Sequence, residues 1–112
     1  MRKLSLTTWE RLQLVKCFPQ TAPTADLYKY VTLSEKLDLS DSDRTHVGFN
    51  IMPDGTASWE DVTWEFEILF EESEYELIAK LVEARYDWPM SRFSLILVEK
   101  VRKATSEVFN GK

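Results

Sequence analysis

The chain has 112 residues, and its 14 Lys and Arg residues against 19 Asp and Glu residues give a formal net charge of -5. This length fits one domain, residues 1–112, and leaves little room for a second. Hydrophobic residues make up 44% of the chain and aromatic residues 12%, with only three Gly and four Pro, which excludes a disordered, collagen-like or low-complexity chain.

The first predicted helix begins at Thr7. Thr7 and Glu10 have the spacing of a capping box, and Pro19 requires the helix to end before it. Apolar residues cover more than one face of this helix, so we expect it to be largely buried. These residues are Trp9, Leu12, Leu14, Val15, Cys17 and Phe18.

A second helix is predicted over residues 24–37, because apolar residues recur there at helical spacing. Leu27, Tyr30 and Val31 fall on one side, with Leu33 and Leu37 beside them. Ser40 and Asp43 again have capping spacing. They predict a short third helix that ends near residue 46.

The hydrophobic period then changes from helical spacing to alternation. Residues 47–51 alternate, the sequence Pro53-Asp54-Gly55 is typical of a turn, and Ala57 and Trp59 follow two residues apart. This pattern predicts a β-hairpin. Apolar residues alternate again over residues 62–70, which predicts a strand, with a helix as the competing assignment.

Two helices are predicted to complete the chain. Ser73 and Glu76 have capping spacing for the first of them, which should end near Asp87-Trp88-Pro89. Ser91 is the expected cap of the last helix, and Asn110-Gly111 is its expected stop. The expected buried stripe of the last helix consists of Phe93, Ile96, Leu97, Val101, Ala104 and Val108.

These elements predict an α+β fold: two to three N-terminal helices, a small antiparallel β-hairpin or sheet, and two C-terminal helices. Three helices followed by a hairpin also suggest a winged-helix-like order. Fold analogy alone does not assign a function.

Residues 60–76 contain eight acidic residues and no basic one, whereas the rest of the chain has a slight excess of basic residues. One interpretation is a solvated strand face followed by the acid-rich first turn of a helix. The other is a docking surface for a basic partner. The candidate partner-binding residues are Glu60, Asp61, Glu65, Glu67, Glu71, Glu72, Glu74 and Glu76.

Two tryptophans are further candidates for partner binding. Trp59 and Trp88 lie at element ends, where aromatic side chains are often half exposed, and Tyr86 is close to Trp88 in the sequence. Tryptophan and tyrosine are common interface anchors, so these residues are candidates for a contact patch. Packing at the edge of the core is the alternative.

The sequence contains no recognisable catalytic set. The only histidine is His46, which fits a surface or helix-end position, and the only cysteine is Cys17, in a helix expected to be buried. One cysteine allows neither an intramolecular disulfide nor a cysteine-based metal site. The three glycines are isolated, so no phosphate loop is present. We therefore expect no enzyme activity, no cofactor and no metal.

No stretch has the apolar length of a membrane span, and residues 1–18 do not have the pattern of a signal peptide. The lone cysteine fits a reducing compartment. We expect a soluble, cytoplasmic protein.

Several short stretches resemble a family of small, uncharacterised proteins of tailed phages and prophages. The resemblance begins with Leu4-Ser5-Leu6, Glu10-Arg11-Leu12-Gln13-Leu14 and Phe18-Pro19. It continues through residues 24–37, Leu39-Ser40-Asp41, Trp59, residues 66–70, and Ile78 with Leu81. It implies a phage-encoded protein that works in a bacterial host cytoplasm, and it transfers no active site.

The acidic segment and the phage resemblance together lead to a functional hypothesis. The chain is expected to be a non-enzymatic protein-binding module, an acidic inhibitor or modulator of a host nucleic-acid-handling protein. The specific form of this hypothesis is an anti-defence role, such as that of an anti-CRISPR protein acting as a DNA mimic. The partner would then carry a basic nucleic-acid-binding surface.

Two alternatives remain open. One is a winged-helix-like transcriptional regulator, although the acidic segment opposes direct DNA binding. The other is a small structural or assembly protein of the phage particle. Self-association through the hairpin edge is also open, because an exposed strand can pair with its copy.

Overall fold

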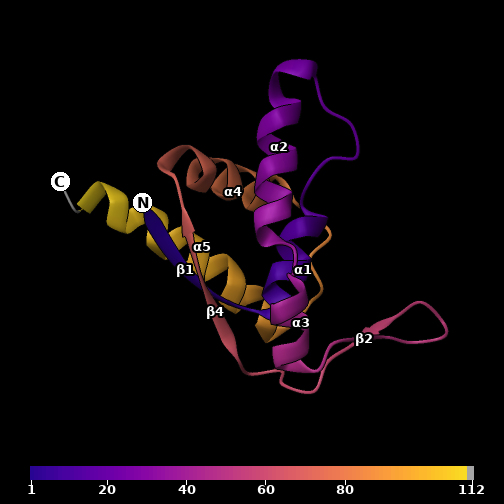
Figure 1. The fold of residues 1–112 in the computed structure, drawn as a ribbon. Coiled ribbons are helices and arrows are strands. Elements are labelled where there is room, and N and C mark those ends of the chain that lie inside the picture. The colour runs from indigo at the N-terminus through magenta and orange to yellow at the C-terminus, as the bar shows by residue number, and fades with distance from the viewer. Residues whose placement is uncertain (111–112) are drawn as a thin grey trace.

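The computed structural model describes the backbone of residues 1–110 and the side chains of residues 1–104. Helices and a small antiparallel sheet form an α+β fold, as expected (Figure 1). The elements in chain order are β1 (Arg2–Thr7), α1 (Thr8–Lys16), α2 (Thr24–Leu37), α3 (Asp41–Val47), β2 (Asn50–Ile51), β3 (Ala57–Ser58), β4 (Glu65–Phe70), α4 (Glu72–Ala84) and α5 (Arg92–Asn110).

The main sheet consists of the first and the last strand of the chain, β1 and β4. β1 and β4 are antiparallel, with Arg2 opposite Phe70 and Thr7 opposite Glu65. Strand β1 was not predicted, although Leu4 and Leu6 are buried with the period of two that marks a strand. The strand assignment for the end of residues 62–70 is correct, and the helical alternative is wrong.

Strand β4 begins at Glu65, later than the predicted start at residue 62. The reason is a local turn, in which the carboxylate of Asp61 accepts hydrogen bonds from the backbone N–H groups of Thr63 and Trp64 at 3.2 and 3.0 Å. An Asp side chain that bonds the following backbone groups favours a turn over an extended strand.

Local capping explains where the first and third helices begin. The Thr7 hydroxyl accepts from the Glu10 N–H, and the Glu10 carboxylate accepts from the Thr7 N–H, which closes the predicted capping box. Ser40 and Asp43 do the same for α3. Helix α2 has the predicted bounds, and its fully buried residues are Leu33 and Leu37.

Helix α1 buries polar side chains that the sequence analysis had not placed inside. Of its apolar residues only Leu14 is fully buried, whereas Glu10, Arg11 and Gln13 are also buried. Arg11 donates to the carbonyl oxygens of Leu37 and Asp38 at 2.8 and 2.6 Å and to the Asp43 carboxylate at 3.0 Å. These bonds attach α1 to the end of α2 and the start of α3.

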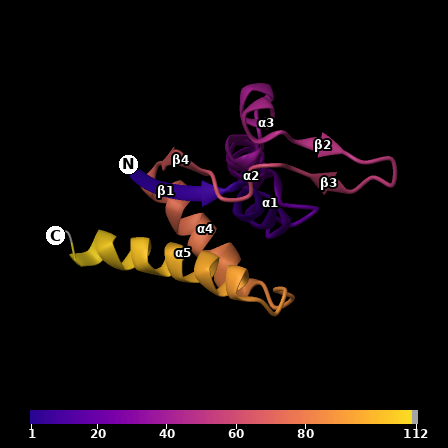
Figure 2. The same cartoon turned by 90° about the horizontal axis from the view of Figure 1, so that it is seen from below.

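The predicted hairpin is present but short. Asn50 pairs with Ser58, and Ile51 pairs with Ala57. It forms a sheet of its own, separate from β1 and β4, and projects from the body of the protein (Figure 2). Gly55 has a φ of 88°, a backbone conformation that favours glycine and allows the turn.

The predicted cap of α4 is wrong by two residues. Glu71 is the N-cap residue, because the Glu74 carboxylate accepts from the Glu71 N–H at 2.7 Å and the Glu71 carbonyl accepts from the Tyr75 N–H. Ser73 therefore lies inside the helix.

Helix α5 begins after the predicted cap, Ser91, and buries Leu97 and Val101. Phe93 and Ile96 were predicted to be buried as well, but they are 65% and 41% exposed. The side chain of Val108 and the predicted stop at Gly111 lie outside the described residues.

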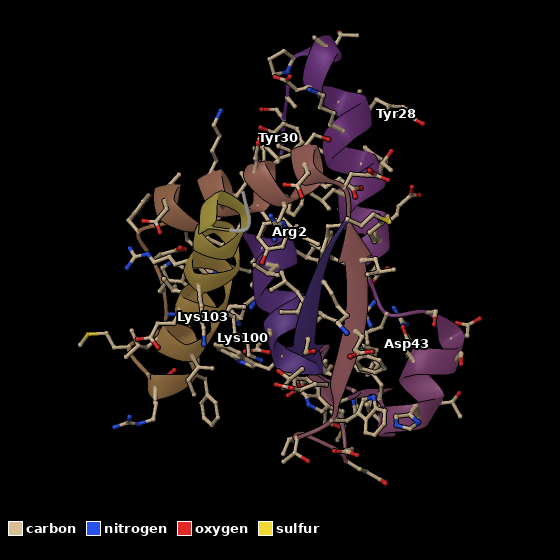
Figure 3. The ribbon with its side chains drawn as sticks, turned by 90° about the vertical axis from the view of Figure 1, so that its left-hand side faces the viewer. Arg2, Tyr28, Tyr30, Asp43, Lys100 and Lys103 are labelled. Carbon is tan, nitrogen blue, oxygen red and sulfur yellow. The ribbon has the colours of Figure 1, made fainter. Side chains whose placement is uncertain are left out.

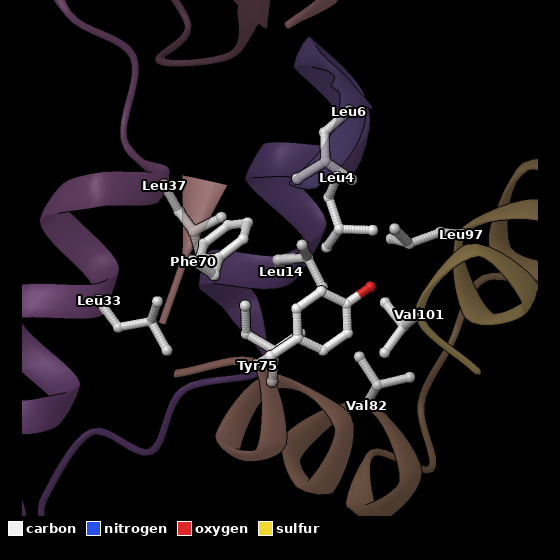
Figure 4. Packing of buried hydrophobic residues seen from close by; sticks show 11 residues of the cluster. Leu4, Leu6, Leu14, Leu33, Leu37, Phe70, Tyr75, Val82, Leu97 and Val101 are labelled. Carbon is white, nitrogen blue, oxygen red and sulfur yellow. The ribbon is translucent and has the colours of Figure 1, made fainter. Parts of the chain in front are cut away.

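The core lies between the β1–β4 sheet and the helices (Figure 4). It combines residues of both strands with residues of α1, α2, α4 and α5. Its buried members are Leu4, Leu6, Leu14, Leu33, Leu37, Phe70, Tyr75, Ile78, Val82, Leu97 and Val101. Figure 3 shows Lys100 of α5 on one side of the two strands and Asp43 of α3 on the other.

Candidate binding groove

The acidic residues of segment 60–76 do not form one uniform surface. Half of them lie in ion pairs with basic side chains of β1, α2 and α5, so their charge is compensated locally. The pairs are Glu65 with Lys100 at 2.7 Å, Glu67 with Lys3 at 3.2 Å, Glu72 with Arg2 at 3.0 Å, and Glu74 with Lys36 at 2.8 Å.

The remaining four acidic residues have separate surroundings. Asp61 closes the turn before β4, and hydrogen bonds from the backbone N–H groups of Trp64 and Thr63 lower the pKa of its carboxyl group. The side chain of Glu60 lies next to Gly48. Glu71 caps α4, and Glu76 is exposed on the same helix. The acidic side chains without an ion pair described above therefore lie on several elements and do not form one continuous acidic surface.

The two tryptophan candidates have different roles in the fold. Trp88 packs against the core, its indole N–H donates to the Val82 carbonyl at 3.4 Å, and the Arg85 guanidinium lies 4.2 Å from its ring centroid. These contacts favour the edge-packing interpretation of Trp88. Tyr86 is almost fully exposed. Trp59 stacks on Phe49, with ring centroids 6.1 Å apart, and also borders a groove.

This groove is a concave surface with apolar walls. It has a volume of about 640 Å³ and lies between the start of α1, the segment before β4 and the first half of α5. Pockets that hold ligands in proteins are typically about 300 to 1,000 Å³ and mostly apolar. The apolar lining consists of Trp9, Trp59, Val62, Phe93 and Ile96. The volume and the apolar lining of the groove are therefore within the range found for ligand pockets.

The aromatic wall of the groove is formed by residues far apart in the sequence. The ring centroids of Trp9 and Phe93 are 6.0 Å apart, and the angle between the two ring planes is 54°. Val62 is 62% exposed on the opposite segment. Thr7 and Thr63 add hydroxyl groups to the lining.

The floor of the groove is a charged cluster centred on Lys100. Its ammonium group donates to the carboxylates of Glu10 and Glu65, both at 2.7 Å, and to the carbonyl oxygen of Ser5 at 3.0 Å. Burial by itself would lower the pKa of Lys100, but the hydrogen bonds to the two carboxylates outweigh it and hold this pKa above its ordinary value. With two carboxylates around one ammonium group, the floor keeps a negative charge.

Of the predicted site residues, the groove brings together only Trp59 and Glu65. Sequence reasoning missed Phe93 and Ile96 because both fit the buried stripe of a helix, and it considered Lys100 only as one of the basic residues available for phosphates. One signal was available: Phe93, Ile96 and Lys100 follow each other at spacings of three and four, which places them on one face of α5.

The two residues considered for nucleophilic chemistry are engaged in packing. His46 lies against Trp64, with ring centroids 4.4 Å apart. Burial raises the pKa of the Cys17 thiol, and this outweighs the opposing effect of Arg85. Within residues 1–104 no group of three or more His, Cys, Asp or Glu side chains is arranged to hold a metal ion.

The region that would read DNA in a winged-helix protein offers little positive charge. Asp54 is the only charged residue in segment 49–59, which contains the hairpin. Helix α3 carries Asp41 and Asp43 together with Arg44. Binding to DNA depends on cationic contacts to phosphates, so this region is poorly suited to it.

A comparison of the chain with protein-family models, with curated proteins and with solved structures found no match. The resemblance to phage proteins therefore stays a prediction. In the described part of the chain, no helix combines the length and the apolar composition needed to cross a bilayer.

Proposed function

We propose that this protein is a non-enzymatic protein-binding module that docks its partner in the groove between α1, residues 59–65 and α5. The observation that supports this most is the exposure of large apolar side chains around a concave surface. Phe93, Ile96 and Val62 remain open to solvent there although the chain has a well-packed core. Rimmed apolar concavities of this kind are typical of interaction sites.

The composition of the groove favours a protein partner. Two tryptophans and a phenylalanine provide large, rigid contact area, and Trp is among the residues that most often dominate binding energy. A partner side chain that packs against Trp59 and the Trp9–Phe93 pair would be removed from water on several sides. Such an anchor is expected to carry much of the affinity.

The partner we propose is a host protein with a basic nucleic-acid-binding surface. This more specific proposal about the partner rests on the acidic segment and on the phage resemblance. Glu67, Glu72 and Glu74 each have a basic partner of their own, whereas Glu65 shares the ammonium group of Lys100 with Glu10. This excess of negative charge favours a contribution from Glu65, which lines the groove, over mimicry of DNA by the whole segment. An inhibitor would then combine an apolar anchor site with nearby negative charge, which together give affinity and specificity.

The test compares two truncations on the same helix. Phe93→Ala removes a wall of the groove, whereas Leu95→Ala removes a side chain that is 54% exposed on α5 but does not line the groove. Each variant and the unmodified chain would be used to capture proteins from the lysate of a bacterium with active defence systems. We expect one basic protein to be recovered with the unmodified chain and with Leu95→Ala, and about tenfold less with Phe93→Ala.

Equal recovery of that protein by both variants would contradict docking in the groove. Circular dichroism of each variant checks that the fold is retained. If the recovered protein handles nucleic acid, its activity would be assayed at increasing ratios of this chain. A stoichiometric loss of activity supports the inhibitor version, and unchanged activity counts against it.

A further inference from the structure

We infer that the groove recognises an arginine or lysine side chain of the partner, presented next to an apolar side chain on one peptide segment. This inference rests on the proposed function and specifies its ligand. It depends on three features of the groove: aromatic walls, a floor with excess negative charge, and an ammonium group that is already saturated with acceptors.

The walls are suited to a cation as well as to apolar groups. A cation is attracted to the face of an aromatic ring, most strongly to tryptophan. Trp9, Trp59 and Phe93 line one concavity. Phe49 stacks on one face of Trp59, so a ligand cation would use the other face. The aliphatic part of an arginine or lysine side chain would pack against Ile96 and Val62, because these long side chains bury their stems and keep their charge at a polar group.

The floor of the groove attracts positive charge. Lys100 is bound by Glu10, Glu65 and the carbonyl oxygen of Ser5, so its three donors already have partners. An anionic ligand would therefore have to displace a carboxylate to reach it. Glu65 is the more open of the two carboxylates, with 45% of its side chain exposed against 5% for Glu10. Glu65 is thus the group that an incoming cation would meet.

The charge of the lining favours a cation over an anion. Glu10, Glu65 and Lys100 line the groove, and their two carboxylates and one ammonium group leave one excess negative charge. This charge opposes phosphates and acidic peptides. Arginine is expected to bind better than lysine, because its planar guanidinium both stacks on aromatic rings and pairs with carboxylates in a bidentate manner.

The experiment selects ligands with the full chain from a random peptide library and measures the binding of the most enriched peptide by isothermal titration calorimetry. We expect enriched peptides to carry arginine or lysine beside an apolar residue. Replacing that arginine by citrulline, its neutral isostere, leaves the protein unchanged and should weaken binding about tenfold. If the selected peptide carries lysine, its replacement by the neutral residue norleucine makes the same test.

Two matched variants of one strand locate the charge that matters. Glu65→Gln removes the open floor carboxylate, and Glu67→Gln removes the same charge two residues away, where it pairs with Lys3 outside the groove. We expect Glu65→Gln to weaken binding of the arginine peptide about fivefold or more. Glu67→Gln should change the affinity for this peptide less than about twofold. Circular dichroism confirms that both variants fold.

Several results would overturn the inference. These are enrichment of peptides without a basic residue, equal binding of the citrulline peptide, equal effects of the two glutamine variants, or no enrichment at all. Equally tight binding of free arginine amide would indicate a small organic cation as ligand in place of a peptide. If purely apolar peptides are enriched and lost with Phe93→Ala, the proposed docking in the groove stands while the inference of a basic ligand fails.

Discussion

Two basic side chains, Arg11 and Lys100, are each held by three oxygen acceptors, but their surroundings give them different roles. Arg11 binds two main-chain carbonyls and one carboxylate, and its side chain is only 4% exposed. Lys100 binds one main-chain carbonyl and two carboxylates, and its side chain is 25% exposed at the floor of the groove. The Arg11 network is closed and charge-balanced, and it joins three helices. The Lys100 network is open and has excess negative charge, so it is available to a ligand.

The largest expected effect on stability comes from opening the Arg11 network. Arg11→Met removes three hydrogen bonds and leaves the carbonyl oxygens of Leu37 and Asp38 without their buried donor. We expect the free energy of unfolding to fall by about 3 kcal/mol. Urea denaturation with an unchanged m-value would measure this. Arg44→Met is the control, because it loses an exposed 3.8 Å ion pair with Asp38 and one 3.3 Å hydrogen bond to the Leu39 carbonyl, and it should cost about 1 kcal/mol or less.

A smaller effect is expected at the Lys100 network. Lys100→Met leaves the buried carboxylate of Glu10 without its ammonium partner, although Glu10 still accepts from the Thr7 N–H. Glu65 lies in a more exposed position and is solvated in the variant. We expect a loss of about 1.5 kcal/mol by urea denaturation. A loss as large as that of Arg11→Met would show that the two networks are equally closed.

The two networks should also respond to opposite ends of the pH range. The pKa of Lys100 is raised in the folded protein, so its contribution is fully present below its ordinary value of 10.5 and is lost as pH rises through the folded pKa. For Asp43, burial opposes the shift, but hydrogen bonds from Arg11 and Ser40 lower its pKa, so its contribution is present above 3.8 and lost as pH falls through the folded pKa.

The measurement is the stability difference between the unmodified chain and each variant as a function of pH. The difference for Lys100→Met should shrink above pH 10.5, and the difference for Arg11→Met should shrink below pH 3.8. Each variant serves as the control for the other. A difference that stays constant across the corresponding range would exclude that titrating group as the source.

The smallest effect on stability is expected in the walls of the groove. Phe93→Ala should change the free energy of unfolding by less than about 0.5 kcal/mol, because Phe93 is 65% exposed. Leu97→Ala, on the same helix but fully buried, should cost about 3 kcal/mol. Thermal unfolding of both variants separates a wall that serves binding from a core residue. Similar losses would mean that Phe93 serves mainly to hold α5 in place.

Sequence reasoning succeeded where a few neighbouring residues determine structure. The capping boxes that begin at Thr7 and Ser40, the bounds of α2 and the turn around Gly55 depend on hydrogen bonds and backbone preferences within one turn of the chain. The same reasoning placed the start of α4 at the wrong capping residue. Ser73 and Glu76 had suitable spacing, but Glu71 and Glu74 formed the first turn.

It failed where a partner far along the chain decides the outcome. The apolar pattern of strand β1 consists only of Leu4 and Leu6. The strand that pairs with β1 lies more than fifty residues away in the sequence. Phe93 and Ile96 have the spacing of a buried stripe, yet they are 65% and 41% exposed and line the groove. Helical spacing identifies a face of a helix but does not say whether that face is covered.

Local sequence patterns predict the α+β class, the positions of most helices and the concentration of acidic residues from the segment before β4 to the first turns of α4. Which of those acidic residues are compensated depends on the tertiary fold, because their partners Arg2, Lys3, Lys36 and Lys100 come from β1, α2 and α5. The tertiary fold also decided that Trp88 packs against the core while Trp59 borders a groove. Helix caps and turns depend on local interactions, whereas burial and charge compensation depend on which distant elements meet.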